Sequence, residues 1–182
     1  MIYIRFLKLP ITYNNNVEIA NLLMEYANRN NIMLTINNKD KKYHHYPLYN
    51  AVAEGNNIEM IKLLINYANR NSIILGMEDN IAGKNPLSWA ISQNNIKMVE
   101  LLLEYTSEKG IKLELKEAII ENTIMEYHKH DKNKCVVNSI FELEPKIIRL
   151  LNVHSKNNQL NIVYNMKNSY KSPLFKRIEE NI

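Results

Sequence analysis

The sequence predicts an all-α protein, an α-solenoid of stacked helix-turn-helix repeats with long connecting loops. One segment recurs, as NNVEIANLLMEYANRN from Asn15, NNIEMIKLLINYANRN from Asn56 and NNIKMVELLLEY from Asn94. Apolar residues inside each copy follow helical spacing. The 182 residues include only 4 glycines and 5 prolines, and this scarcity favours helices over a turn-rich β fold. A segment that returns at a near-regular spacing is typical of a stacked repeat protein.

Each repeat is predicted to hold two antiparallel helices. In the best copy, Leu87, Ala90 and Ile91 fall at i, i+3 and i+4 and form one apolar stripe. A second stripe begins at Ile96 and continues through Val99, Leu102 and Leu103. Only a few residues join the stripes, which predicts an αα-hairpin.

The repeats are expected to divide a single domain, 1–182, into five parts. These parts are an incomplete N-terminal unit 1–45, repeats 46–85 and 86–115, a degenerate repeat with an insertion 116–171, and a half repeat 172–182. We expect residues 1–14 to form a short helical or extended cap. The helix after it, Val17 to Asn28, is predicted to turn Ile19, Leu22, Leu23 and Tyr26 inward.

The connections after the second helices repeat an apolar patch, at 32–34, 73–75 and 111–113. This recurrence predicts that the root of each loop packs on the helices while its tip projects as a finger. Adjacent His44 and His45 would then alternate sides of an extended finger.

Beyond Leu113 the pattern weakens. Segments 116–122 and 145–151 are predicted to be a first and a second helix, separated by an insertion from Met125 to Phe141. Ser172-Pro173-Leu174 then echoes Asn85-Pro86-Leu87 and starts another first helix. We expect the last dozen residues to be weakly held, because no second helix follows them.

The repeat resembles an ankyrin repeat. The residues that carry the resemblance are Gly83-Lys84-Asn85-Pro86-Leu87-Ser88-Trp89-Ala90-Ile91, Asn94-Asn95, Met98-Val99 and Leu101-Leu102-Leu103. The preceding copy has Tyr46-Pro47-Leu48, Ala51-Val52 and Gly55-Asn56 at the matching places. Ser88 and Tyr49 replace the family's His, and Asn85 and Tyr46 replace its Thr, which weakens the match at the turns and leaves the architecture intact.

The resemblance implies a partner-binding concave face made by the fingers and the first helices. By position in the repeat, the candidate residues are Lys42, Tyr43, His45, Ala53, Glu54, Ile81, Ala82, Lys84, Ser92 and Gln93.

The insertion holds the types of residue that could carry chemistry, namely His128, His130, Asp131 and Cys135. Their spacing matches no standard zinc motif, and Cys135 has no recognisable base nearby in the sequence. We therefore predict no metal, no cofactor and no catalytic residue, and the protein is not expected to be an enzyme.

Composition indicates a protein that stays inside the cell, with a cytoplasmic location expected. The single cysteine cannot form an internal disulfide, and no signal peptide or membrane-spanning run is visible. The formal charge of +4 is spread along the chain, and no nucleic-acid recognition motif accompanies the lysine runs.

The primary hypothesis is a non-catalytic scaffold that binds another protein through the fingers and first helices. The half-built ends leave a second hypothesis open, a regulatory or targeting segment of a larger protein or adaptor. A third, direct nucleic-acid binding, would show steep salt dependence.

Overall fold

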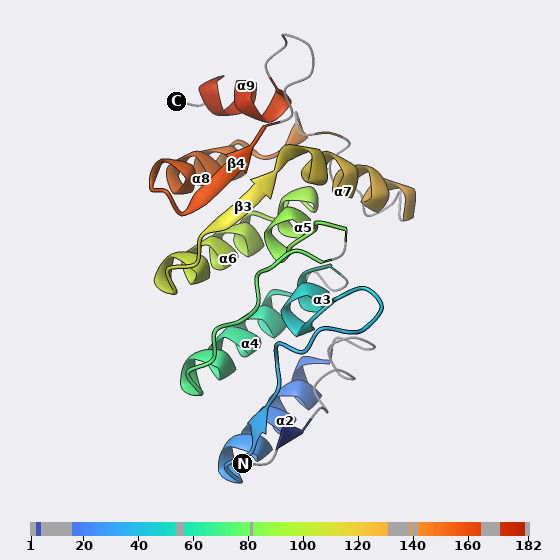
Figure 1. The fold of residues 1–182 in the computed structure, drawn as a ribbon, viewed down its shortest axis with the longest axis vertical. Coiled ribbons are helices and arrows are strands. Elements are labelled where there is room, and N and C mark those ends of the chain that lie inside the picture. The colour runs from blue at the N-terminus through green and yellow to red at the C-terminus, as the bar shows by residue number, and fades with distance from the viewer. Residues whose placement is uncertain are drawn as a thin grey trace. The chain divides into compact units, whose positions relative to one another are not determined.

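The computed structural model describes residues 3–4, 16–53, 57–80, 82–130, 139, 142–164 and 172–180. Side chains are described for most of these, with those of residues 3, 4, 126–130 and 175 excepted. The chain divides into two compact units, Met1–Pro86 and Leu87–Ile182, called unit 1 and unit 2 below. Helices dominate both (Figure 1), which confirms the predicted all-α class. No helix in the described part of the chain is long and apolar enough to cross a membrane.

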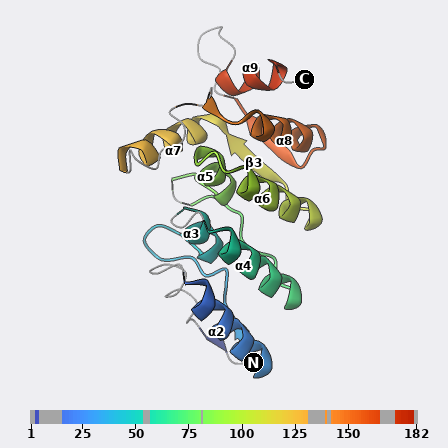
Figure 2. The same ribbon diagram turned by 180° about the vertical axis from the view of Figure 1, so that it is seen from behind.

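Unit 1 contains two long helices with a short helix beside the second of them. In chain order its elements are β1 (Tyr3–Ile4), α2 (Val17–Arg29), β2 (Met33–Leu34), α3 (Pro47–Ala53) and α4 (Ile58–Arg70). Helix α3 packs on α4, and α2 also packs on α4 (Figures 1 and 2). The short strands β1 and β2 pair in parallel, so the predicted N-terminal cap contains an extended segment.

Unit 2 repeats the helix pair and adds a small sheet. Its elements are α5 (Pro86–Ser92), α6 (Ile96–Glu108), β3 (Leu113–Lys116), α7 (Glu117–His130), α8 (Pro145–Lys156), β4 (Leu160–Val163) and α9 (Pro173–Glu180). The first residue of α5 lies at the boundary between the units. The helices predicted at 116–122, at 145–151 and after Ser172 are all present, although Lys116 belongs to β3. Helix α7 continues past Met125 to His130, so the predicted insertion begins inside a helix.

Strands β3 and β4 pair in parallel, with Leu113 opposite Leu160 and Leu115 opposite Ile162. All four of these side chains are buried, while the residues between them are exposed. This alternation places one face of the strands in the core. Parallel pairing requires a long crossover connection, which α7 and α8 provide.

In three of the four copies, an asparagine immediately precedes the long second helix. Asn16, Asn57 and Asn95 accept hydrogen bonds from the third backbone N–H that follows, at 3.0, 3.2 and 3.1 Å. These are N-caps, which satisfy a donor that the helix itself cannot pair. Helix α8 has Glu144 at this position and no side-chain cap.

The four long second helices, α2, α4, α6 and α8, end in the same way. The residue after the C-cap has a positive φ, at Asn31 (53°), Ser72 (55°), Gly110 (64°) and Asn158 (57°). The next backbone N–H returns to the helix, as in Ile32 to Ala27 (2.8 Å). This is the Schellman motif, which pairs the last carbonyls of a helix. The repeated ending places α8 in the same series as α2, α4 and α6.

The predicted loop roots pack back on the helices. Leu34, Leu75 and Leu113, one from each predicted patch, expose 4%, 1% and 8% of their surface. In unit 1, the Leu34 N–H donates to the Tyr67 hydroxyl oxygen at 3.1 Å. One leucine of each root therefore belongs to the core, as expected, whereas Ile74 of the second root is 60% exposed.

The prediction for the inward face of α2 is wrong. Ala20, Met24 and Ala27 are buried, whereas Ile19, Leu22 and Tyr26 are 46%, 59% and 60% exposed. The other residue predicted inward, Leu23, is half-buried. Helix α2 packs on α4 and β2, so one of its stripes is buried while the predicted stripe is left largely exposed.

Candidate partner-binding surface

The first finger, residues 40–45, is closed by one carboxylate. Asp40 accepts the backbone N–H groups of Lys42 (2.9 Å), Tyr43 (2.7 Å) and His45 (2.8 Å). Its own N–H donates to the His45 carbonyl at 2.8 Å. Three donors on one side chain fix the loop as a compact turn, because a charged acceptor makes strong hydrogen bonds.

The expectation of an extended finger is therefore wrong. His44 takes a left-handed conformation at φ 57°, and its N–H donates to the Asp40 carbonyl at 3.2 Å. The result is that His44 is exposed and His45 is half-buried. The two histidines still face different surroundings, as predicted, but a turn separates them rather than strand alternation.

Three aromatic rings stack from the finger down to the helix. The centroids of Tyr43 and His45 lie 5.4 Å apart, and those of His45 and Tyr49 lie 4.3 Å apart at 24° between planes. Tyr49 is buried in α3 at 2% exposure, whereas Tyr43 is 46% exposed. Lys42 Nζ lies 4.5 Å from the centroid of the Tyr43 ring, a cation–π distance. The buried Tyr49 ring thus supports, through His45, an exposed aromatic ring and the lysine beside it.

The second finger, residues 80–84, copies the first with an amide in place of the carboxylate. Asn80 Oδ1 accepts the N–H groups of Ala82 (2.8 Å) and Lys84 (3.0 Å), and the Asn80 N–H donates to the Lys84 carbonyl at 2.8 Å. Gly83 has φ 72°, a conformation that glycine adopts without strain.

Asn80 also joins the two fingers. Its Nδ2 donates to the Tyr49 hydroxyl at 2.9 Å and lies 3.3 Å from His45 Nε2. An amide nitrogen is a donor only, so this contact requires the neutral His45 ring to present an acceptor. The stack and the two fingers are consequently one connected assembly within unit 1.

The pKa shifts agree with this arrangement. Burial lowers the pKa of His45 and so does nearby Lys84, while Asp40 acts in the opposite direction. Burial raises the pKa of Asp40, but the hydrogen bonds from Tyr43, His45 and Lys42 outweigh it and leave that pKa below its usual value. The fingers therefore hold a neutral imidazole and an ionised carboxylate at neutral pH.

The residues predicted from the repeat fall into three groups. Lys42, Tyr43 and His45 come together in the first finger, and exposed Ala82 lies in the second. Ala53 is half-buried at the end of α3, and Glu54 and Ile81 lie outside the described residues. The remaining three, Lys84, Ser92 and Gln93, are 6%, 1% and 5% exposed and offer a partner little surface. Ser92 and Gln93 belong to unit 2.

The structure adds residues that the sequence analysis did not single out. Asp40 and Asn80 organise the fingers, and Tyr49 anchors the stack. A signal was present, since an Asp or Asn stands seven and six residues before Pro47 and Pro86 and such side chains close local turns. The side chains of His128, His130, Asp131 and Cys135 lie outside the described residues, so the expectation of no chemistry there stays a prediction.

Comparison with protein families agrees with the repeat pattern. A family model described as ankyrin repeats (3 copies) matches residues 11–116, which is more than half of the 182 residues. The searches of curated proteins and of solved structures returned no match. The chain belongs to the ankyrin-repeat family.

Proposed function

We propose that this chain is a non-catalytic scaffold that binds a partner protein through the fingers of unit 1. Ankyrin repeats are generally protein-protein interaction modules and are typically not catalytic. The observation that carries the proposal is the stack from Tyr49 to Tyr43, which holds an exposed tyrosine on a closed turn. A rigid aromatic group loses little entropy on binding, and such residues dominate many interfaces.

The charge of the first finger indicates the chemistry of the partner surface. Lys41 and Lys42 are exposed there, while the Asp40 carboxylate is taken up by backbone donors. The outward charge of this finger is therefore positive. A partner surface with carboxylates around a pocket for the Tyr43 ring would be complementary to it.

Affinity capture from the native cell tests the proposal when it is run with matched variants. We expect Tyr43→Ala to reduce recovery of the bound protein by about tenfold or more, the loss typical of an interface hot spot. Tyr26→Ala is the control, because Tyr26 is also an exposed tyrosine, at 60%, but lies outside the fingers.

Two results would count against the fingers as the binding surface. One is full recovery with Tyr43→Ala, and the other is equal loss with Tyr26→Ala. Recovery that falls steeply with salt and disappears after nuclease treatment would instead indicate a nucleic-acid ligand.

A further inference from the structure

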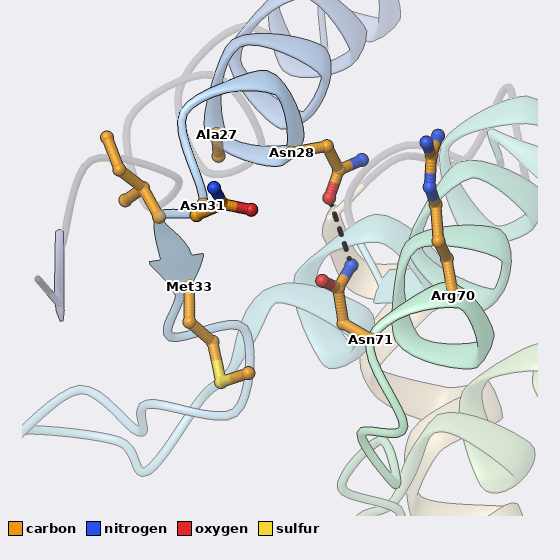
Figure 3. Close-up of a pocket in the computed structure, with 7 residues that line it drawn as sticks. Ala27, Asn28, Asn31, Met33, Arg70 and Asn71 are labelled. Carbon is orange, nitrogen blue, oxygen red and sulfur yellow. Dashed lines mark hydrogen bonds between the residues drawn. The ribbon is translucent and has the colours of Figure 1, made fainter. Parts of the chain in front are cut away.

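A second surface of unit 1 lies at the C-terminal ends of α2 and α4. Both helices end in the same five residues, Tyr-Ala-Asn-Arg-Asn, at 26–30 and 67–71. Between these two ends lies a hollow of about 290 Å³, whose lining includes Asn28, Asn31, Arg70 and Asn71 (Figure 3). In unit 1 the C-terminal ends of α2 and α4 point away from the loop between β2 and α3 (Figure 1).

Hydrogen bonds fix which way the Asn28 amide points. Asn71 Nδ2 donates to the Tyr67 carbonyl at 2.9 Å and to Asn28 Oδ1 at 3.2 Å. Both of its N–H groups are then used, and Asn28 must present its oxygen to Asn71. The Asn28 Nδ2 group therefore lies on the other side of the amide, where Figure 3 shows it directed toward Arg70.

The arginines of the two helix ends differ in whether an acidic side chain lies beside them. Arg29 contacts the Glu25 carboxylate at 3.4 Å, one helical turn earlier. The residue one turn before Arg70 is Asn66, which carries no charge. Within the described residues Arg70 makes no ion pair, and its side chain is exposed. The sequence thus repeats the arginine but not the acid that would neutralise it.

Two donors consequently face the same space. The Arg70 guanidinium is a planar cation that can donate two parallel hydrogen bonds to a carboxylate, and the Asn28 amide supplies a further donor. The same hollow is lined by the apolar side chains of Ala27, Ile32 and Met33. This combination suits a group with an anionic end and an aliphatic stem.

We propose that Arg70 and Asn28 form a binding site for the carboxylate of a glutamate side chain on a partner protein. The half-buried Ile32 and Met33 side chains contact the methylene groups of that glutamate. The site is separate from the fingers, so it does not depend on the function proposed for them.

The test is titration of the full chain with two peptides, followed by NMR of the side-chain N–H groups. The probe is acetyl-Gly-Leu-Glu-Leu-Gly-amide, and the control peptide has Gln in place of Glu. We expect saturable shifts of the Arg70 Nε–H and Asn28 Nδ2 signals with the Glu peptide. The Gln peptide is expected to bind about fivefold more weakly, as fits an exposed ion pair.

Substitutions at the two helix ends provide matched variants. Asn66→Glu recreates the arrangement of Glu25 and Arg29, so it should occupy Arg70 and weaken binding of the Glu peptide about twofold. Arg29→Gln removes the already paired arginine and should leave binding unchanged. Circular dichroism confirms that each variant remains folded.

Three outcomes would overturn the proposal. They are equal binding of the Glu and Gln peptides, unchanged binding by Asn66→Glu, and loss of binding in Arg29→Gln. Stronger binding of inorganic phosphate than of the Glu peptide, at equal ionic strength, would also overturn it, because the site would then be a phosphate site.

Discussion

Helices α2 and α4 share a sequence pattern and one buried face, but α4 also buries a second stripe that α2 leaves exposed. Ile19 is 46% exposed in α2, whereas its equivalent in α4, Met60, is fully buried. Tyr26 is 60% exposed, and its equivalent, Tyr67, is 3% exposed. In α6 the same positions hold Met98 and Tyr105, at 0% and 2%.

The difference shows that packing neighbours, rather than the pattern, determine which stripe of a repeat helix enters the core. In α4 the Tyr67 stripe meets the root of the preceding connection, through the hydrogen bond from Leu34 to the Tyr67 hydroxyl. Among the described residues, α2 has no equivalent contact at Tyr26. Repeat proteins are stabilised largely by such nearest-neighbour interfaces.

The largest expected effect on the free energy of unfolding is at the two equivalent tyrosines, Tyr67 and Tyr26. Tyr67→Ala should lower the free energy of unfolding by about 3–5 kcal/mol, since it empties a buried aromatic site. Tyr26→Ala should change it by less than about 0.5 kcal/mol, as for other exposed positions. Chemical denaturation of both variants measures the two values. Equal losses of stability in the two variants would contradict the claim that α2 and α4 differ in the burial of this stripe.

A smaller change isolates the hydroxyl group. Tyr67→Phe keeps the ring but leaves the buried Leu34 N–H without its acceptor, which should cost about 1–3 kcal/mol. Tyr26→Phe should have no measurable effect. If Tyr67→Phe is as stable as the parent protein, the hydrogen bond contributes nothing and the contact is packing alone.

The N-caps of α2 and α4 allow the two helices to be compared without the contribution of neighbouring elements, because a cap is a local interaction. Asn16→Ala and Asn57→Ala each delete a local cap, so both should lose about 1 kcal/mol. We expect similar losses in the two helices, measured as the fall in helical signal and in thermal stability. A loss confined to Asn57 would mean that α2 contributes little to the cooperative unit.

The smallest effect concerns pH. The folded protein lowers the pKa of His45, chiefly by burial, so the unfolded chain binds this proton more readily. Stability from this group is complete above the ordinary histidine pKa near 6.5 and falls as pH decreases below it. Denaturation at pH 7.5 and 5.5 should show that His45→Gln removes part of this fall.

The difference between the Tyr26→Ala and Tyr67→Ala variants should be the same at both pH values, because both variants keep His45 and its surroundings. A His45→Gln variant with the same pH dependence as the parent would contradict the assignment of this term to His45.

Helix type and loop roots could be predicted from the sequence because both leave periodic apolar patterns. Leu34, Leu75 and Leu113 stand at the same place in each repeat and are all buried. The parallel pairing of β3 with β4 could not be predicted, since each strand has only four residues. Helices α7 and α8 lie between the two strands in the sequence, and nothing local specifies the match.

The residues of the candidate partner-binding surface were predicted only from their position in the repeat. Repeat position indicated the first finger correctly as a projecting segment, because a turn with lysines cannot be buried readily. It could not indicate that Lys84, Ser92 and Gln93 are buried, since their burial depends on contacts between distant segments. The role of Asp40 is likewise a matter of hydrogen bonds, which leave no periodic trace.

Thiol labelling tests most directly whether neighbours decide burial. Ile19→Cys and Met60→Cys are made separately in a Cys135→Ser background, and the rate of reaction with a soluble thiol reagent is measured in the folded and urea-unfolded states. Cys at position 19 should react at nearly the unfolded rate, while Cys at position 60 should be protected roughly 100-fold or more, because it reacts only after local opening. Equal labelling at the two positions in the folded protein would contradict the account.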